Sequence, residues 1–207
     1  MARLVVFEGI DGSGKTSLSK LFLERLGERG EAATWLREPG DSPWGQTIRR
    51  LAQDRDAISI QQELELFIED RRWDVERNIL PALRAGTTVV LDRYYYSNAC
   101  YQGARGLDVE GILRRNREFA PEPDLVFIVD VDVDRALERI GRTRATTARL
   151  FEKQDFLEKV RANYLALRGA NLALIDGNPP LQPVLEAVLA RYALLATTPP
   201  RDWQDRA

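Results

Sequence analysis

The architecture of this chain follows from one stretch, Leu4-Val5-Val6-Phe7-Glu8-Gly9-Ile10-Asp11-Gly12-Ser13-Gly14-Lys15-Thr16. The apolar run from Leu4 to Phe7 predicts a buried strand, and the pattern that follows Lys15 is helical. Between them, residues 9–16 match G-x-x-x-x-G-K-[ST] in full. Glycines let successive backbone N–H groups turn inward around a polyphosphate, and the helix N-terminus adds partial positive charge. The stretch therefore predicts a site for a nucleoside triphosphate.

Every residue of this phosphate loop is expected to contact the triphosphate. The loop consists of Gly9, Ile10, Asp11, Gly12, Ser13, Gly14, Lys15 and Thr16. Lys15 can reach the outer phosphates, and the hydroxyl of Thr16 can bind Mg²⁺, which prefers oxygen ligands. A glycine-rich turn beside a surface lysine is the alternative, but a strand, a loop and a helix in this order favour the triphosphate site. The motif alone does not separate a GTPase switch, an ATPase motor and a small-molecule kinase.

The composition excludes several kinds of chemistry. The 207 residues include one cysteine and no histidine, which excludes a Ser-His-Asp hydrolase, a Cys-His protease and a histidine-ligated zinc site. A single cysteine fits the reducing cytoplasm, where we expect the protein. The net charge of −2 favours neither nucleic acid nor an anionic membrane as a partner. No apolar run reaches the ~18 residues of a membrane span.

Short apolar runs alternate with amphipathic stretches along the chain. Strands are predicted at residues 4–7, 32–36, 87–91, 125–129 and 172–175. Helices are predicted between them, among others at residues 45–53, 60–85 with a kink at Pro81, 134–142 and 184–195. The alternation predicts an α/β fold, the three-layer P-loop NTPase fold with a five-stranded parallel sheet flanked by helices. We assign residues 1–195 to a single domain, residues 142–152 to a lid loop and residues 196–207 to a flexible tail.

Charged residues directly follow two of these strands. Asp92 and Arg93 come after the third predicted strand, and Arg37 comes after the second. The carboxyl ends of parallel strands meet at one edge of the sheet, where the phosphate loop must also lie. Asp92 can hold Mg²⁺ there, and Arg37, Arg49 and Arg93 can bind the phosphate of a second nucleotide. A salt bridge at the strand end and a solvated helix face are the alternatives.

Two further groups of residues can recognise a base. Phe67 and Arg71 lie four residues apart, so they share one face of the long predicted helix. Taken alone, Phe67 also fits a core position and Arg71 a surface position. Residues 97–103 predict a short helix, with Ser97 near its N-cap and Gly103 at its C-cap. From one face of this helix project Asn98, Tyr101 and Gln102, although a capped surface helix remains the alternative.

The segment 143–149 lacks apolar periodicity and predicts a mobile loop. Arg142, Arg144 and Arg149 lie in or beside it. A lid of this kind would close over the triphosphate, exclude water and bring an arginine to the transferring phosphoryl group. A solvated basic loop is the alternative.

The chain resembles the thymidylate kinase family, P-loop enzymes that phosphorylate dTMP with ATP, over about residues 3–195. The matching motifs are Phe7-Glu8-Gly9-Ile10-Asp11-Gly12-Ser13-Gly14-Lys15-Thr16, Arg37-Glu38-Pro39-Gly40, Phe67-x-x-Asp70-Arg71, Asp92-Arg93-Tyr94 with Ser97, Tyr101-Gln102-Gly103, and Leu150-Phe151-Glu152 leading to Val160-Arg161-x-x-Tyr164. Several such motifs in one order are far more specific than the phosphate loop alone.

The resemblance implies conversion of dTMP and Mg-ATP into dTDP and ADP by a homodimer whose interface includes the long helix. It implies that Phe67 stacks on thymine, that Arg71 bonds its O4 and that Tyr101 crowds the sugar 2′ position. Asn98 or Gln102 would meet the base edge, and Asp11 would lie near the 3′-hydroxyl. The implied dTMP site comprises Asp11, Arg37, Arg49, Phe67, Arg71, Arg93, Ser97, Asn98, Tyr101 and Gln102. The residues expected to act in the transfer are Lys15, Asp11, Arg93, Arg142, Arg144 and Arg149, with Thr16 and Asp92 as metal ligands.

The chain departs from the family pattern at two places. One branch of the family has an arginine where this chain has Gly12, so the chain resembles the other branch, in which lid arginines supply that charge. Many members continue Gly-Gly-Thr where this chain reads Gly40-Asp41-Ser42-Pro43-Trp44, and Asp41 adds a negative charge near the expected phosphate pocket.

Three alternative functions follow from the sequence. Because of Asp41, a divergent paralogue acting on another pyrimidine deoxynucleotide stays open. A deoxynucleoside kinase, with Glu8 as the base, stays open too. A GTP-dependent switch is disfavoured, since the chain lacks an Asn-Lys-x-Asp segment for guanine.

Overall fold

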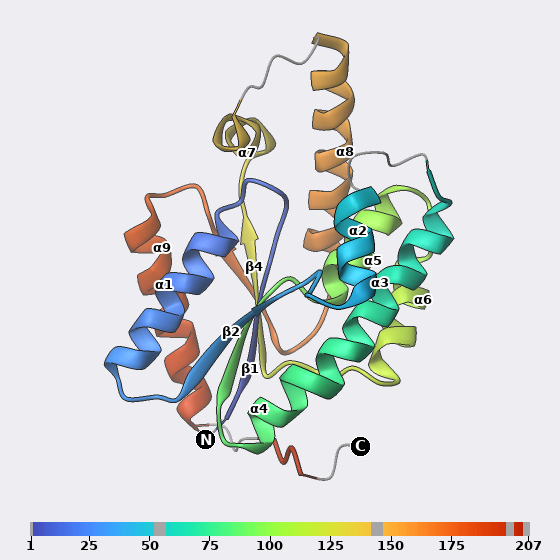
Figure 1. Ribbon diagram of the computed structural model, residues 1–207. Coiled ribbons are helices and arrows are strands. Elements are labelled where there is room, and N and C mark those ends of the chain that lie inside the picture. The colour runs from blue at the N-terminus through green and yellow to red at the C-terminus, as the bar shows by residue number, and fades with distance from the viewer. Residues whose placement is uncertain (1, 52–56, 142–146, 198–200, 205–207) are drawn as a thin grey trace.

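The computed structural model describes residues 2–51, 57–141, 147–197 and 201–204 (Figure 1). Its strands are β1 (Leu4–Glu8), β2 (Ala33–Arg37), β3 (Thr88–Asp92), β4 (Leu125–Asp130) and β5 (Leu172–Asp176). They form one five-stranded parallel sheet in the order β2-β3-β1-β4-β5. The central position of β1 places the phosphate loop, which follows it, at the middle of the carboxyl edge of the sheet. The predicted fold class is confirmed.

Helices cover both faces of the sheet (Figure 1). They are α1 (Lys15–Glu28), α2 (Pro43–Leu51), α3 (Ile60–Asp74), η1 (Val75–Ile79), α4 (Leu80–Arg84), α5 (Tyr95–Ala104), α6 (Val109–Arg117), α7 (Val133–Ile140), α8 (Thr147–Ala166), α9 (Leu181–Ala193) and η2 (Leu194–Thr197). Figure 1 shows α1 and α9 on one face, while α3, α4, α5, α6 and α8 lie on the other.

The alternation of side chains along β1 divides the core into two parts. Val5 and Phe7 point to one face and pack with apolar side chains of α1 and α9. Leu4 and Val6 point to the other face and pack with side chains of α3, α5 and α8. Because β1 is buried on both faces, its apolar run is continuous rather than alternating.

The long helix predicted for residues 60–85 contains a π turn, η1, directly before Pro81. Proline donates no N–H to the helical ladder and crowds the preceding turn. In the widened turn the N–H of Leu80 donates to the carbonyl of Val75, five residues earlier. The helix ends at Arg84, and Gly86 follows with φ of +82°, a conformation that favours glycine at a helix terminus.

Several predicted helix boundaries are wrong. The prediction for α2 began at Gly45, whereas the helix begins at Pro43 with Ser42 capping it. Ser97 is not an N-cap, because α5 begins two residues earlier, and the predicted C-cap Gly103 lies inside that helix. Part of the predicted lid loop, from Thr147 on, belongs to α8.

The described part of the predicted tail packs against the body of the protein. Trp203 is buried, and its Nε1 donates to the carbonyl of Ala2 at 3.3 Å. Arg201 pairs with Glu122. Residues 201–204 thus cover the end of the sheet remote from the phosphate loop (Figure 1), and the flexibility expected for residues 196–207 stays a prediction.

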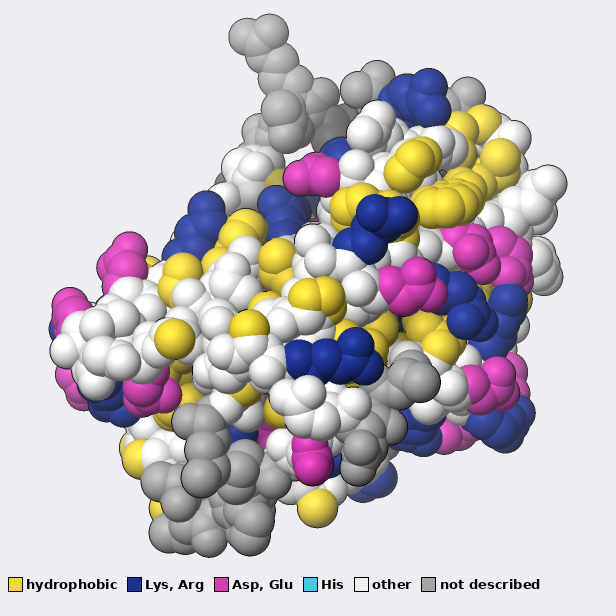
Figure 2. All heavy atoms as spheres, turned by 60° about the horizontal axis from the view of Figure 1, so that its bottom comes forward, with side chains coloured by type: hydrophobic (Ala, Val, Ile, Leu, Met, Phe, Trp, Pro, Cys, Tyr) yellow, Lys and Arg dark blue, Asp and Glu magenta, His cyan; other side chains and the backbone are white. Residues whose placement is uncertain are grey.

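Charges of both signs mix on the face shown in Figure 2, where Lys and Arg side chains lie among Asp and Glu. Within the described residues, no helix is both long and apolar enough to cross a membrane.

Candidate active site

The phosphate loop is tightly enclosed by neighbouring backbone. Gly9 has φ of +142° and Gly12 has φ of +83°, conformations that side-chain-bearing residues rarely adopt. A Cβ atom on Gly9 would lie 2.5 Å from the carbonyl oxygen of Val129, and one on Gly12 would lie 2.3 Å from that of Ala136. Both positions therefore require glycine, for space as well as for conformation.

Lys15 begins α1 with its ammonium group inside the loop. It is 5% exposed, and its Nζ donates to the carbonyl of Ile10 at 3.2 Å. Burial, together with the nearby cation of Arg93, lowers the pKa of Lys15 to about 7. Asp11, Asp92 and Glu8 oppose this lowering, and a polyphosphate in the loop would add further negative charge that favours the protonated ammonium group.

Thr16 and Asp92 form an oxygen-rich pair beside the loop. Thr16 Oγ1 donates to Asp92 Oδ2 at 2.6 Å. The second carboxylate oxygen, Asp92 Oδ1, is buried without a hydrogen-bond partner among the described residues. An unpaired buried oxygen is costly unless a donor or a cation occupies the site, so these two residues fit Mg²⁺.

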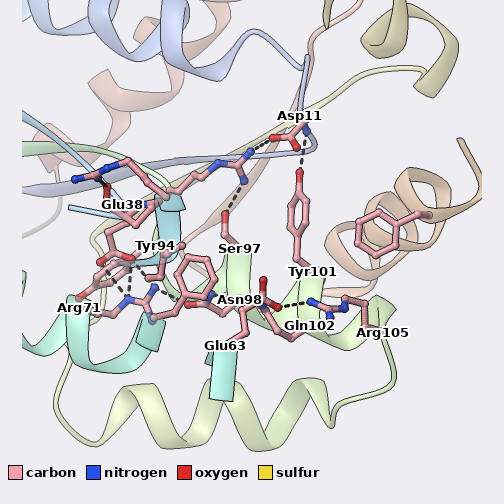
Figure 3. Close-up of a pocket in the computed structure, with 16 residues that line it drawn as sticks. Asp11, Glu38, Glu63, Arg71, Tyr94, Ser97, Asn98, Tyr101, Gln102 and Arg105 are labelled. Atoms are coloured by element: carbon pink, nitrogen blue, oxygen red, sulfur yellow. Dashed lines mark hydrogen bonds and ion pairs between the residues drawn. The ribbon is translucent and has the colours of Figure 1, made fainter. Parts of the chain in front are cut away.

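A cavity of about 290 Å³ opens next to the phosphate loop, and we call it the central cavity (Figure 3). It is lined by Asp11, Glu38, Pro39, Ile48, Arg49, Glu63, Phe67, Arg71, Arg93, Tyr94, Ser97, Asn98, Tyr101, Gln102, Arg105 and Phe156. Residues from the phosphate loop, α2, α3, α5 and α8 thus converge there. Of the residues predicted to bind a second nucleotide, all except Arg37 line it.

Polar groups at one end of the central cavity are fixed by one another. Arg93 pairs with Asp11, and its Nη1 donates to Ser97 Oγ at 3.0 Å. The backbone N–H of Asp11 donates to the hydroxyl of Tyr101 at 2.9 Å (Figure 3). Arg93 has φ of +72°, a strained value for a residue with a side chain, and its N–H is held by the carbonyl of Phe7 at 3.0 Å. This end presents a preorganised cation directly beside the phosphate loop.

Arg71 occupies the other end of the central cavity and is only 1% exposed. Its Nε donates to both carboxylate oxygens of Glu38, at 3.1 and 2.9 Å, and its Nη2 also contacts Glu38. The same guanidinium donates to Asn116 Oδ1 at 2.7 Å and to Asn98 Oδ1 at 2.6 Å. The surface position considered for Arg71 is therefore wrong. Phe67, one turn earlier on α3, is half-buried at the cavity wall.

Two opposing effects determine the pKa of Glu38 in its buried pair with Arg71. Burial raises the pKa of Glu38 to about 8, although the adjacent guanidinium of Arg71 opposes that rise. A guanidinium has five N–H donors, and the contacts of Arg71 with Glu38, Asn98 and Asn116 use four of them. One Nη1 hydrogen has no hydrogen-bond partner among the described residues. It can serve a carbonyl oxygen of a ligand.

Two predicted phosphate-binding arginines lie at the rim. Arg49 lines the central cavity, and its Nη1 donates to the carbonyls of Pro39 and Gly40 at 3.0 and 2.7 Å. Arg37 instead lines a neighbouring cavity of about 620 Å³, the side cavity, with its Nε 3.9 Å from Asp92 Oδ2. Arg49 also lines this side cavity.

The lid arginines are placed only in part. Arg142 and Arg144 lie outside the described residues. Arg149 belongs to the first turns of α8. Farther along α8, Phe156 reaches the central cavity and its ring contacts that of Tyr101 edge-on, with centroids 6.1 Å apart.

Glu8 joins three elements around the site. Its Oε1 accepts from the N–H groups of Tyr94 and Ser97 at 2.8 and 3.1 Å, and its Oε2 accepts from Ser97 Oγ and Tyr164 OH at 2.6 and 2.8 Å. Glu8 is fully buried. Glu8 is not among the residues that line the central cavity, and both of its oxygens bind donors of the protein, so the structure does not favour the base role considered for a deoxynucleoside kinase.

Several residues of the site were not predicted from the sequence. No role was predicted for Glu38, Asn116, Phe156 or Arg139. Arg139 on α7 donates to the carbonyls of Ser13 at 3.1 Å and Gly177 at 3.0 Å. Glu38 could have been found, because it follows Arg37 at the end of a strand. The other three carry no local signal, since only tertiary packing brings their helices to the site.

Comparisons with known proteins agree on one family. A sequence model described as Thymidylate kinase matches residues 7–188. A "Probable thymidylate kinase" of Archaeoglobus fulgidus is 44% identical over 185 residues, which cover 89% of this chain and 92% of that protein. A "Thymidylate kinase" of Desulfotalea psychrophila is 44% identical over 165 residues, covering 80% and 81%. One of Brachyspira hyodysenteriae is 35% identical over 187 residues, covering 90% and 91%.

Removal of one hydroxyl should reveal how far the fold depends on Glu8. We expect Tyr164→Phe to lower the free energy of unfolding by about 1–2 kcal/mol, because the buried carboxylate loses a donor. Burial raises the pKa of Glu8, and the Tyr164 hydroxyl opposes that rise. The loss should therefore be larger at pH 8 than at pH 5, where a protonated carboxyl needs fewer donors. Urea unfolding at both pH values measures it.

A buried tyrosine without a contact to Glu8 provides the control. Tyr95 OH donates to Tyr96 OH at 3.2 Å, so Tyr95→Phe also removes a buried hydroxyl. Its effect should not change between the two pH values. Equal pH dependence of both variants would contradict the assignment.

Proposed function

This chain belongs to the thymidylate kinase family and phosphorylates dTMP to dTDP with ATP, and we propose that the transfer takes place between the phosphate loop and the central cavity. The observation that carries this placement is the central cavity itself. One of its ends, with Asp11 and Arg93, adjoins the phosphate loop, and its other end presents Phe67 and Arg71. A monophosphate can thus face a triphosphate while its base lies away from the reaction.

We propose that the base end reads thymine. Phe67 offers a flat apolar surface for stacking, and the remaining Nη1 hydrogen of Arg71 suits the O4 carbonyl. Cytosine has an amino group at this position, and an N–H donor cannot bond to it. Asn98 and Gln102 line the same end, and the hydroxyl of Tyr101 lies toward Asp11, where the sugar would sit.

The transfer itself requires positioning and positive charge rather than a base. The attacking atom is an oxygen of the dTMP phosphate, whose second pKa is about 6 by analogy with other phosphate monoesters. It is therefore ionised at neutral pH, and no proton has to be removed. As its bond to the γ-phosphorus forms, the bond to the bridging oxygen of ADP breaks. Lys15 and Arg93 would stabilise the charge that spreads over the transferring group.

Thr16 and Asp92 would hold Mg²⁺, which supplies positive charge to the outer phosphates when bound. Support for this assignment is the unpaired Oδ1 of Asp92. The lid arginines Arg142, Arg144 and Arg149 stay candidates for further charge. Arg37 pairs with Asp92, so its guanidinium would lie between the Mg²⁺ site and the acceptor phosphate.

A third cavity, of about 250 Å³, is a candidate site for the donor base. It adjoins Ser13 and Gly14 of the phosphate loop and is otherwise walled by apolar side chains such as Leu181 and Val184. Arg139 also lines it, with its guanidinium tied to loop carbonyls. A purine attached to a triphosphate in the loop would find a flat apolar surface there.

An acceptor panel tests the proposed function. With Mg-ATP, we expect turnover of dTMP well above that of dCMP, and none of thymidine, because the nucleoside lacks the attacking phosphate. Product formation can be followed by chromatography, and chelation of Mg²⁺ should abolish it. Turnover of dUMP or dCMP with none of dTMP would refute the acceptor assignment, and turnover of thymidine would indicate a nucleoside kinase.

Triphosphate binding should be accompanied by proton uptake. With a pKa of about 7, Lys15 is mostly neutral at pH 8, and an adjacent polyphosphate would restore its proton. We expect uptake of nearly one proton per ATP at pH 8 and much less at pH 6, where Lys15 already carries its charge. Calorimetric titrations in two buffers of different ionisation enthalpy give the number of protons taken up per ATP bound.

The matched variants are Lys15→Met and Lys20→Met. The first should remove both the proton uptake and the activity without unfolding the protein. The second changes an exposed lysine on the same helix and should leave both intact. Equal proton uptake in the two variants would contradict the role of Lys15.

We further propose that the enzyme is a homodimer, as its family resemblance implies. The long helix expected at the interface carries the half-buried apolar side chains of Leu66 and Trp73 on α3. Light scattering should give the mass of two chains, and the mass of one chain at micromolar concentration would exclude the dimer. A cytoplasmic location likewise stays a prediction, which cell fractionation can test.

A further inference from the structure

A carboxylate faces each arginine that is assigned to the acceptor phosphate. The pairs are Arg93 with Asp11, Arg37 with Asp92, and Arg49 with Asp41. Asp11 and Asp92 have proposed roles beside the sugar and the metal. Asp41 has none, and it stands where many family members have a glycine.

The backbone on both sides of Asp41 is firmly held. The N–H of Gly40 donates to Asp70 Oδ2 at 2.8 Å, and Ser42 Oγ donates to Asp70 Oδ1 at 2.5 Å. Ser42 Oγ also accepts from the N–H of Gly45 at 3.0 Å and so caps α2. Asp41 is thereby kept beside α2, although its side chain is 98% exposed.

Arg49 lies between the two cavities. Its Nη2 is 3.2 Å from Asp41 Oδ1, while its Nη1 donates to the carbonyls of Pro39 and Gly40. Arg49 lines both the central cavity and the side cavity, whereas Asp41 is found only among the residues that line the side cavity. The carboxylate therefore engages this guanidinium from outside the acceptor site.

We propose that Asp41 is an internal counter-ion that competes with the acceptor phosphate for Arg49 and weakens acceptor binding. An incoming dianion has to share or displace the Asp41 contact, and the remaining carboxylate repels it. Because Asp41 is exposed, water and salt screen the effect, which limits it to the size of a surface ion pair. Its action is on binding, so it should alter KM rather than kcat.

Because this role rests on the proposed function, its test measures binding as well as turnover. We expect Asp41→Asn to lower the Kd and the KM for dTMP roughly threefold, as a surface ion pair allows. The kcat should stay within about twofold, and the Kd for thymidine, which lacks the phosphate, should not change. At 0.5 M salt the difference between the Kd values of the variant and the wild type for dTMP should become smaller, because exposed charges are screened.

Gln46→Ala is the matched control. Gln46 donates to the backbone carbonyl of Asp41 at 3.2 Å, so its loss perturbs the same loop without removing the charge. It should leave the Kd for dTMP unchanged. An unchanged or higher Kd of Asp41→Asn for dTMP would overturn the inference. An equal decrease in its Kd for thymidine would overturn it as well.

Failure of the proposed function gives a different result. If the wild-type chain turned over another nucleoside monophosphate and not dTMP, the acceptor assignment would be wrong. Asp41→Asn should then still lower the Kd for that monophosphate and leave the Kd for its nucleoside unchanged.

Discussion

The carboxylate of Glu8 is the contact on which the geometry of the site depends. It ends β1, immediately before the phosphate loop, and accepts hydrogen bonds from Tyr94 and Ser97 at the start of α5 and from Tyr164 on α8. A buried carboxylate is stable only when donors surround it. The need to supply those donors therefore restricts how β1, the start of α5 and α8 can pack together. Through Ser97, the same network also fixes Arg93. Side chains of the protein itself thus hold the phosphate loop and α5 in fixed positions relative to each other.

The charge distribution suits a reaction that needs no proton transfer. The chain has 30 Lys and Arg residues against 32 Asp and Glu residues and no histidine, and two of its cations, Lys15 and Arg93, lie near each other beside the phosphate loop. Lys15 is buried there with a lowered pKa, and Arg93 is held by Asp11. Both are arranged before substrate arrives, which reduces the reorganisation that the transition state requires. An ionised phosphate nucleophile makes a general base unnecessary.

Sequence reasoning succeeds where the physical cause is local. The phosphate loop, the five strands and the carboxyl edge follow from glycine chemistry and apolar periodicity. It fails where a distant residue takes over a local role. Ser97 has the side chain of an N-cap, but Glu8 binds both its hydroxyl and its N–H, so α5 begins earlier. Trp203 lies in a polar tail that has no helical pattern, and its burial comes from contacts across the fold, with an apolar cluster that includes Leu4 and with the carbonyl of Ala2.

The two ends of the central cavity differ in rigidity, and this difference has a consequence for selectivity. Arg71 is enclosed by Glu38, Asn98 and Asn116, so it loses little freedom on binding a base and cannot turn to accommodate the wrong one. Arg49 is exposed, and among the described residues its guanidinium contacts two loop carbonyls and one exposed carboxylate. Its contribution to a phosphate is therefore adjustable by a single surface charge. In the proposed site, the buried end would read the identity of the base, while the exposed rim would adjust the affinity for the phosphate, because a substitution there leaves the buried contacts of the fold intact.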